Sequence, residues 1–164
     1  MSNKKKNHIV AIVMGSQSDY STMRYSQKVL KILKIKHEIK IVSAHRTPER
    51  MYQFAKTAER NNISVIIAGA GGSAHLPGMI AAITRIPVIG VPIESKKLKG
   101  LDSLLSIAQM PKGIPVGTVA IGEDGAINAG LYAASIIATY DNNVKKTLLN
   151  WRKKQTSKVK KKPK

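Results

Sequence analysis

The neighbouring residues His45 and Arg46 are the side chains in this sequence best suited to catalysis. They lie within the segment Ser43-Ala44-His45-Arg46-Thr47-Pro48. An imidazole, whose ordinary pKa is about 6.5, can accept and return a proton near neutral pH. A guanidinium can donate two parallel hydrogen bonds to a phosphate. The plainer interpretation is a capping-loop histidine beside a surface arginine. The pair therefore raises the hypothesis of an acid–base site next to a bound anion without deciding it.

A glycine-rich stretch joins a β-branched run to a helical pattern at residues 65–79. Its part Gly69-Ala70-Gly71-Gly72-Ser73-Ala74 matches the dinucleotide pattern G-x-G-x-x-A, and Glu94 follows near the expected ribose position. The match lies in the third strand–helix unit instead of the first, so alone it is a weak signal. Ser73 also stands in half of a nucleophile elbow, but no base and acid accompany it. The stretch does predict a floor of exposed backbone N–H groups for a ligand.

A third polar loop, Gly15-Ser16-Gln17-Ser18-Asp19, follows the first apolar run. Its hydroxyls and backbone N–H groups at a helix start suit a phosphate, although it lacks the lysine of a P-loop. Asp19 would repel a phosphate and is better suited to accept hydrogen bonds from ribose hydroxyls. By composition alone, capping of the following helix by Ser18 or Asp19 is an equal alternative.

The chain has no cysteine, four histidines and nine carboxylates. The absence of cysteine excludes disulfides, thiolate metal sites and a cysteine nucleophile, and it fits a reducing compartment. The other candidate ligands show no metal-binding spacing such as H-E-x-x-H, and a metal held by His45 and His75 has no support. We therefore expect neither a metal nor an organic cofactor. No segment has membrane-spanning length, so we expect a cytoplasmic protein.

The formal net charge is +19, while aromatic residues make up only 4% of the chain. Binding of nucleic acid or of an anionic surface would be the specific explanation. Lysine, however, is a default surface residue, and side chains that could stack on bases are scarce. Zinc-finger spacing and RNA-binding aromatic motifs are absent from the sequence. We therefore expect nucleic-acid binding not to be the main function.

The polar loops lie where predicted strands give way to helices. Apolar or alternating runs predict five strands, at residues 8–14, 37–42, 65–68, 87–92 and 116–121. Strands that alternate with helices indicate a parallel sheet with helices on both faces. The second strand alternates with charged residues and so belongs at an edge. This predicts the order 2-1-3-4-5, an α/β three-layer flavodoxin-like sandwich, whose ligands bind at the carboxyl ends of strands one and three.

The C-terminal part begins with residues 125–139, which carry no charge and many alanines. Such a helix must be buried on every side, and because the sheet is already covered, we expect another subunit to cover it. A well-covered core helix is the alternative. An extra C-terminal helix is expected at residues 142–154. Residues 1–157 are expected to form a single domain, and the lysine-rich residues 158–164 a disordered tail.

Five long motifs follow one another over about residues 8–155: I-V-M-G-S-x-S-D, V-S-A-H-R-T-P, I-I-A-G-A-G-G-x-A-H-L-P-G-M, D-S-L-L-S-I-x-Q-M-P-x-G-I-P-V and A-I-G…N-A-G-L-Y-A-A. With these motifs the chain resembles the 5-(carboxyamino)imidazole ribonucleotide mutases of bacterial purine synthesis. Several long motifs together are far more specific than the short fingerprints above. The resemblance implies a flavodoxin-like homo-octamer without cofactor or metal. It also implies transfer of a carboxylate from the exocyclic amine of an imidazole ribonucleotide to carbon 4.

Carried over by position, the resemblance implies that His45 shuttles the proton. The other positions that it assigns to the substrate are Ser16 and Arg46 for the phosphate, with Ser18 nearby, Asp19 for the ribose hydroxyls, Ser43 and the backbone of Ala70 and Gly71 for the migrating carboxylate, and His75 and Leu76 for the pocket wall. Position in the predicted fold also favours His45. His8 and His37 begin strands at the opposite end of the sheet, and His75 begins a helix whose dipole disfavours an imidazolium.

Two departures from the family pattern lie outside the core motifs: Ser73 stands where alanine is frequent, and residues 94–99 are unusually charged. Three alternatives stay open at this point. An aminoimidazole ribonucleotide carboxylase that uses free carbon dioxide would share the fold. A dinucleotide-binding oxidoreductase and a basic nucleic-acid-binding module belong to other classes of protein.

Overall fold

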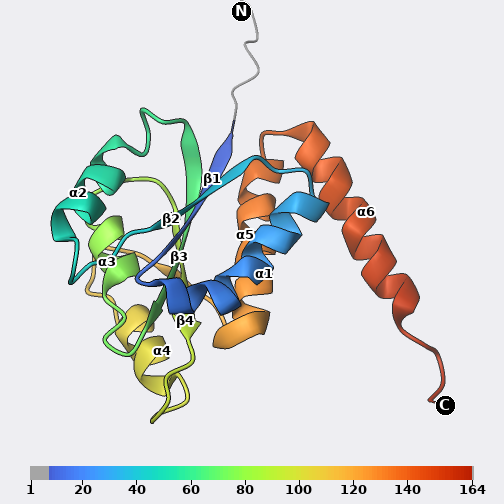
Figure 1. Cartoon of the computed structure of the whole chain (residues 1–164). Coiled ribbons are helices and arrows are strands. Elements are labelled where there is room, and N and C mark those ends of the chain that lie inside the picture. The colour runs from blue at the N-terminus through green and yellow to red at the C-terminus, as the bar shows by residue number, and fades with distance from the viewer. Residues whose placement is uncertain (1–7, 164) are drawn as a thin grey trace, which may run out of the picture.

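Five parallel strands form the central sheet in the computed structural model, which describes residues 8–163 (Figure 1). The strands are β1 Ile9–Met14, β2 His37–Ile41, β3 Ile63–Gly71, β4 Val88–Ile93 and β5 Gly117–Thr118. Their order is β2-β1-β3-β4-β5, as the sequence predicts for a flavodoxin-like sheet. The basic segment before residue 8 and the last residue of the lysine-rich tail lie outside the described residues.

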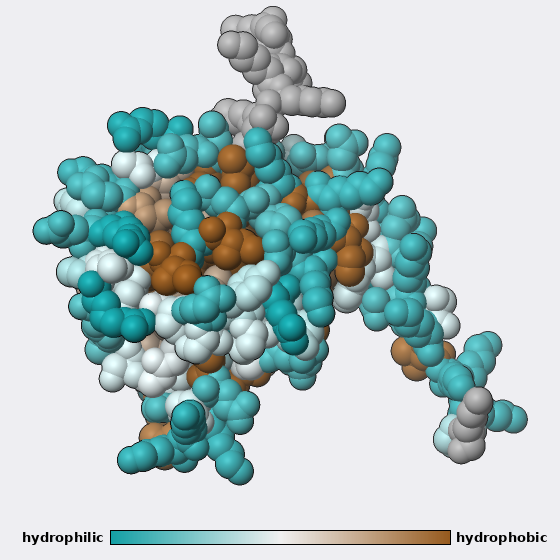
Figure 2. Space-filling model, in the orientation of Figure 1, coloured by the Kyte–Doolittle hydropathy of each residue, from teal (hydrophilic) through white to brown (hydrophobic). Residues whose placement is uncertain are grey.

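Helices cover both faces of the sheet and give the molecule three layers. They are α1 Tyr20–Ile32, α2 Pro48–Thr57, α3 Leu76–Ala81, α4 Leu101–Ala108, α5 Gly122–Ala138 and α6 Asn142–Lys158, with the short 3-10 helix η1 Gln17–Asp19 before α1. Figure 1 shows α2, α3 and α4 on one side of the strands and α1, α5 and α6 on the other. The far end of α6 projects away from the body, and hydrophilic side chains cover most of the face seen in Figure 2.

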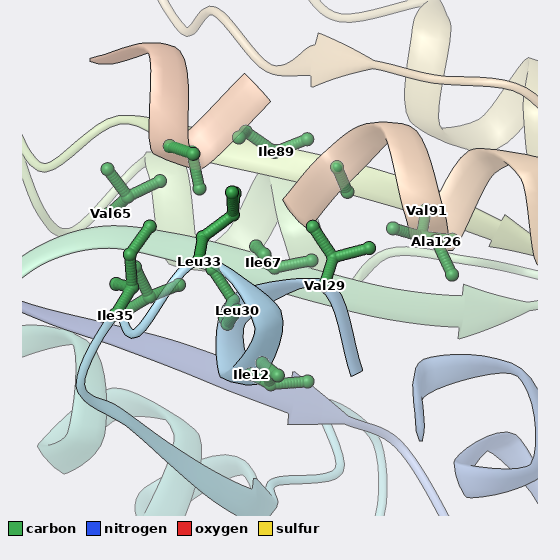
Figure 3. Close-up of a cluster of buried hydrophobic side chains, with 14 of the residues drawn as sticks. Ile12, Val29, Leu30, Leu33, Ile35, Val65, Ile67, Ile89, Val91 and Ala126 are labelled. Atoms are coloured by element: carbon green, nitrogen blue, oxygen red, sulfur yellow. The ribbon is translucent and has the colours of Figure 1, made fainter. Parts of the chain in front are cut away.

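Successive side chains of the inner strands point to opposite faces of the sheet, so the apolar core consists of one cluster on each face. Val10, Ile12 and Met14 of β1 belong to the cluster shared with α1 and α5, part of which Figure 3 shows. Ala11 and Val13 belong to the cluster on the α2 and α3 face. Successive side chains of a strand point to opposite faces, so a strand buried on both faces reads as a continuous apolar run. These clusters hold the carboxyl ends of β1 and β3 in place.

Several element boundaries differ from the sequence prediction. Strand β5 is only two residues long, Gly117–Thr118, and α5 begins at Gly122, whose φ is 75°. Helix α6 continues to Lys158, beyond the predicted end at residue 154. In the single chain the Tyr132 side chain of α5 is 48% exposed, so the alternative of a core helix covered within one chain is wrong, while its covering by another subunit stays a prediction. Within residues 8–163, none of the helices is long and apolar enough to cross a membrane.

Candidate active site

A cleft of about 470 Å³ opens where the loops after β1, β2 and β3 meet. All of the residues that the sequence assigned to substrate or proton transfer line it except Ser18. Ser18 is exposed, and its hydroxyl lies 2.6 Å from the Ser16 hydroxyl, which does line the cleft. The sheet order explains the convergence, because the carboxyl ends of parallel neighbours lie at one edge.

The imidazoles of His45 and His75 contact each other across the cleft. His45 Nε2 lies 2.9 Å from His75 Nδ1, and the two rings meet edge to face with centroids 5.0 Å apart. His45 comes from the loop after β2, while His75 directly precedes α3. A bond between two ring nitrogens needs one donor and one acceptor, so the tautomer of one ring fixes the role of the other. Both side chains are exposed to the cleft and can reach a ligand.

Arg46 forms hydrogen bonds to the loop after β1 and to Ser43. Its Nη2 donates to the Gly15 carbonyl at 2.9 Å, and its backbone N–H donates to the Ser43 hydroxyl at 3.2 Å. The Thr47 hydroxyl donates to the Ser43 carbonyl and accepts from the Ser43 N–H, both at 3.0 Å, instead of capping α2. These bonds hold the guanidinium near Ser16, where together they can bind a phosphate.

The carboxylate of Asp19 turns back toward the loop that precedes it. Its Oδ2 accepts from the Ser16 N–H at 3.0 Å, and it makes no capping bond to α1 although it lies at that N-cap. The helix-capping alternative from the sequence is therefore wrong for α1. Burial raises the pKa of the Asp19 carboxyl above its ordinary value of 3.8, and hydrogen bonds from Ser16, Gly15 and Ser18 oppose that rise.

Glycines at the end of β3, Gly69 beneath the cleft and Gly72 in its lining, exclude a side chain for two different reasons. A side chain at Gly69 would overlap the buried Met23 side chain, so this position has no room for a Cβ. A side chain at Gly72 would meet nothing within 4 Å, but its φ of 66° is strained for other residues. Ala70 and Gly71 lie between them and pair with Pro92 and Ile93 of β4.

The loop after β4 also contributes to the cleft, through Glu94, Ser95 and Lys96. Sequence reasoning noted these charges but left their place open. Their position in the sequence could have placed them in the cleft, because Glu94, Ser95 and Lys96 follow β4. That strand lies directly beside β3, whose end carries the glycine floor. Within the described chain, no three histidine or carboxylate side chains come together in a way that could hold a metal ion.

The fold and cleft define a flavodoxin-like α/β protein with a nucleotide-sized site at the switch point of its sheet. A solved structure of PurE from Treponema denticola has a TM-score of 0.84, with 29% identity, 92% of this chain and 93% of that chain covered. A family model described as AIR carboxylase matches residues 9–158, and the chain belongs to this family.

Curated relatives share more than half of their residues with this chain. The N5-carboxyaminoimidazole ribonucleotide mutase of Escherichia coli K12 is 56% identical over 159 residues, which cover 97% of this chain and 94% of the relative. The protein of the same name from Brucella melitensis is 58% identical, with 94% of this chain and 95% of the relative covered.

Proposed function

We propose that this protein converts N5-carboxyaminoimidazole ribonucleotide to 4-carboxy-5-aminoimidazole ribonucleotide in purine biosynthesis. The observation that carries the proposal is the contact between His45 and His75 above a glycine floor, with Arg46 and Asp19 in the same cleft. The relatives with over 50% identity and nearly full coverage are named for this mutase activity. An intramolecular carboxylate transfer of this kind is an isomerisation.

The substrate would lie with its phosphate against Ser16 and Arg46 and its ribose hydroxyls on Asp19. Arg46 is already oriented by Gly15 and Ser43, so little side-chain freedom is lost when the phosphate binds. In this orientation the imidazole base reaches the glycine floor, where Ser43 and the backbone of Ala70 and Gly71 would contact the carboxylate. His75 and Leu76 would form the adjoining wall.

The chemistry requires one carbon–nitrogen bond to break and one carbon–carbon bond to form. The carboxylate leaves the exocyclic nitrogen as carbon dioxide, and the bonding electron pair stays on nitrogen, which gains a proton. Carbon 4 then attacks the retained carbon dioxide and afterwards loses its own proton, which restores the aromatic ring. His45 would carry this proton, as a general acid and base with His75 as its hydrogen-bond partner.

An assay with the carboxyamino substrate, without ATP, biotin or added metal, tests this proposal directly. Spectroscopic appearance of 4-carboxy-5-aminoimidazole ribonucleotide is the expected result. The second candidate is a carboxylase of free carbon dioxide, favoured by the name of the matching family model. Turnover of 5-aminoimidazole ribonucleotide with bicarbonate, together with no turnover of the carboxyamino compound, would establish the second candidate and contradict the first.

A cytoplasmic homo-octamer is the assembly that we propose. Helix α5 leaves Tyr132 48% exposed, and Leu101 and Leu105 of α4 are 51% and 49% exposed. Apolar side chains at this exposure favour burial against further subunits. A chain without cysteine also suits a reducing compartment. Sedimentation should give the mass of an octamer at micromolar concentration, whereas a folded monomer would contradict the proposal.

A further inference from the structure

Ser103 connects the ends of two strands beneath the cleft. This side chain is fully buried near the start of α4, at 0% exposure. Its hydroxyl accepts from the Gly72 N–H at 2.9 Å and donates to the Ile93 carbonyl at 2.7 Å. Gly72 directly follows β3, and Ile93 ends β4, so one hydroxyl satisfies a backbone group at each strand end.

The same turn of α4 also holds the rim of the cleft. Asp102 Oδ1 accepts from the Ser95 hydroxyl at 2.7 Å and from the Ser103 N–H at 2.9 Å. The Ser95 hydroxyl in turn accepts from the Gly100 N–H at 3.2 Å. The glycine floor and the charged loop after β4 are therefore joined through adjacent residues of one helix.

We infer that Ser103 is a positioning residue that fixes the Gly71–Gly72 backbone against the reacting carboxyl group; the inference rests on the proposed function. Gly72 has a φ of 66° and no neighbour within 4 Å of the position of a Cβ, so side-chain packing does not hold this peptide. Without the hydroxyl, the Gly72 N–H and the Ile93 carbonyl would lose their buried partner. The Gly72 peptide would then reorient to recover a hydrogen bond. A floor displaced in this way no longer retains carbon dioxide beside carbon 4.

The test compares Ser103→Ala with Ser26→Ala. Ser26 is a matched control, because it is also 0% exposed and its hydroxyl donates to the Ala126 carbonyl at 2.6 Å in the opposite layer. Both variants should lose comparable stability in urea. Only Ser103→Ala should lose turnover, by roughly tenfold to a hundredfold, with KM changed much less, since misplacement of a reacting group acts on this scale.

Retention of an isotope label gives a readout that stability alone does not change. With ¹³C in the substrate carboxylate and unlabelled bicarbonate in solution, wild type and Ser26→Ala should keep the label in the product. Ser103→Ala should lose it, because carbon dioxide escapes from the loosened floor. Equal turnover and equal label retention in the two variants would overturn the inference.

Amide hydrogen exchange at Gly72 tests the inference without relying on activity. Exchange at this amide should be faster in Ser103→Ala than in Ser26→Ala, and unchanged protection would overturn the inference even in an active enzyme. An inactive wild type would refute the proposed function instead. If Ser103→Ala does not fold, Ser103→Cys replaces it in the same comparison, because a thiol is only a weak donor and acceptor.

Discussion

His45 Nε2 lies 2.9 Å from His75 Nδ1, so the two imidazoles share a hydrogen bond in which one ring donates and the other accepts. His75 directly precedes α3, at the N-cap position of that helix. His45 lies in the loop between β2 and α2, next to Arg46, which we propose binds the substrate phosphate. We propose that His45 carries the proton and that His75 orients it.

Replacement of Asp19 by asparagine should stabilise the protein at neutral pH. Because burial raises the pKa of the Asp19 carboxyl, the folded state binds more protons than the unfolded chain between the two pKa values. The contribution of this carboxyl to stability therefore falls as pH rises through that window. Asparagine keeps an oxygen for the Ser16 N–H without the buried charge. Urea unfolding should show the gain at pH 7 and its loss at pH values below the ordinary carboxyl pKa.

The same Asp19→Asn variant should bind substrate more weakly, since a neutral amide is a poorer acceptor for ribose hydroxyls than a carboxylate. We expect a raised KM with a smaller change in kcat. Stability lower than wild type at neutral pH would contradict the pKa argument, and an unchanged KM would contradict the ribose assignment.

Alanine at Gly69 or at Gly72 should destabilise the protein for different reasons. Gly69→Ala places a methyl group on the fully buried Met23 side chain, and overpacking of this kind costs roughly 1–3 kcal/mol. Gly72→Ala meets no neighbour but strains a left-handed backbone, at a cost of about 1–2 kcal/mol. Differential scanning calorimetry should place Gly69→Ala at or below Gly72→Ala in melting temperature. A Gly69→Ala variant as stable as wild type would refute the packing argument.

Truncation from residue 158 onward should leave turnover unchanged. Helix α6 ends at Lys158, the next side chain, Val159, is 77% exposed, and none of residues 158–163 lines the cleft. A lysine-rich segment of this composition buries too little apolar surface to offset the entropy of ordering it. Turnover and sedimentation of the truncated and full chains provide the comparison. A large loss of either would show that the tail docks on the assembly.

The sheet order was predictable because the alternation of β2 with charged residues marked an edge, while the β1, β3 and β4 runs had to be buried on both faces. Once the order was set, the three polar loops had to converge, and the cleft contains them.

The contact between His45 and His75 depends on two side-chain conformations, which spacing along the chain does not encode. The hydrogen bond from Gly72 to Ser103 joins residues 31 positions apart, so no local pattern indicates it.

The short length of β5 was not predicted from the sequence, and the partner that covers α5 was left open. Apolar composition at residues 116–121 is compatible with a longer strand, but only Gly117 and Thr118 pair with β4. An uncharged helix indicates burial without naming the partner. In the described chain, that partner is partly α1, α6 and the sheet, and the remaining face stays exposed.

The most direct test of the proposed mechanism is turnover of His45→Asn beside that of His75→Asn, with the carboxyamino substrate. Asparagine can still form hydrogen bonds at position 45 but cannot transfer a proton near neutral pH. His45→Asn should bind substrate within a few-fold of wild type while turnover falls at least about a hundredfold, the usual scale of acid–base catalysis. Near-normal turnover of His45→Asn with an inactive His75→Asn would contradict the assignment and give the proton-carrying role to His75.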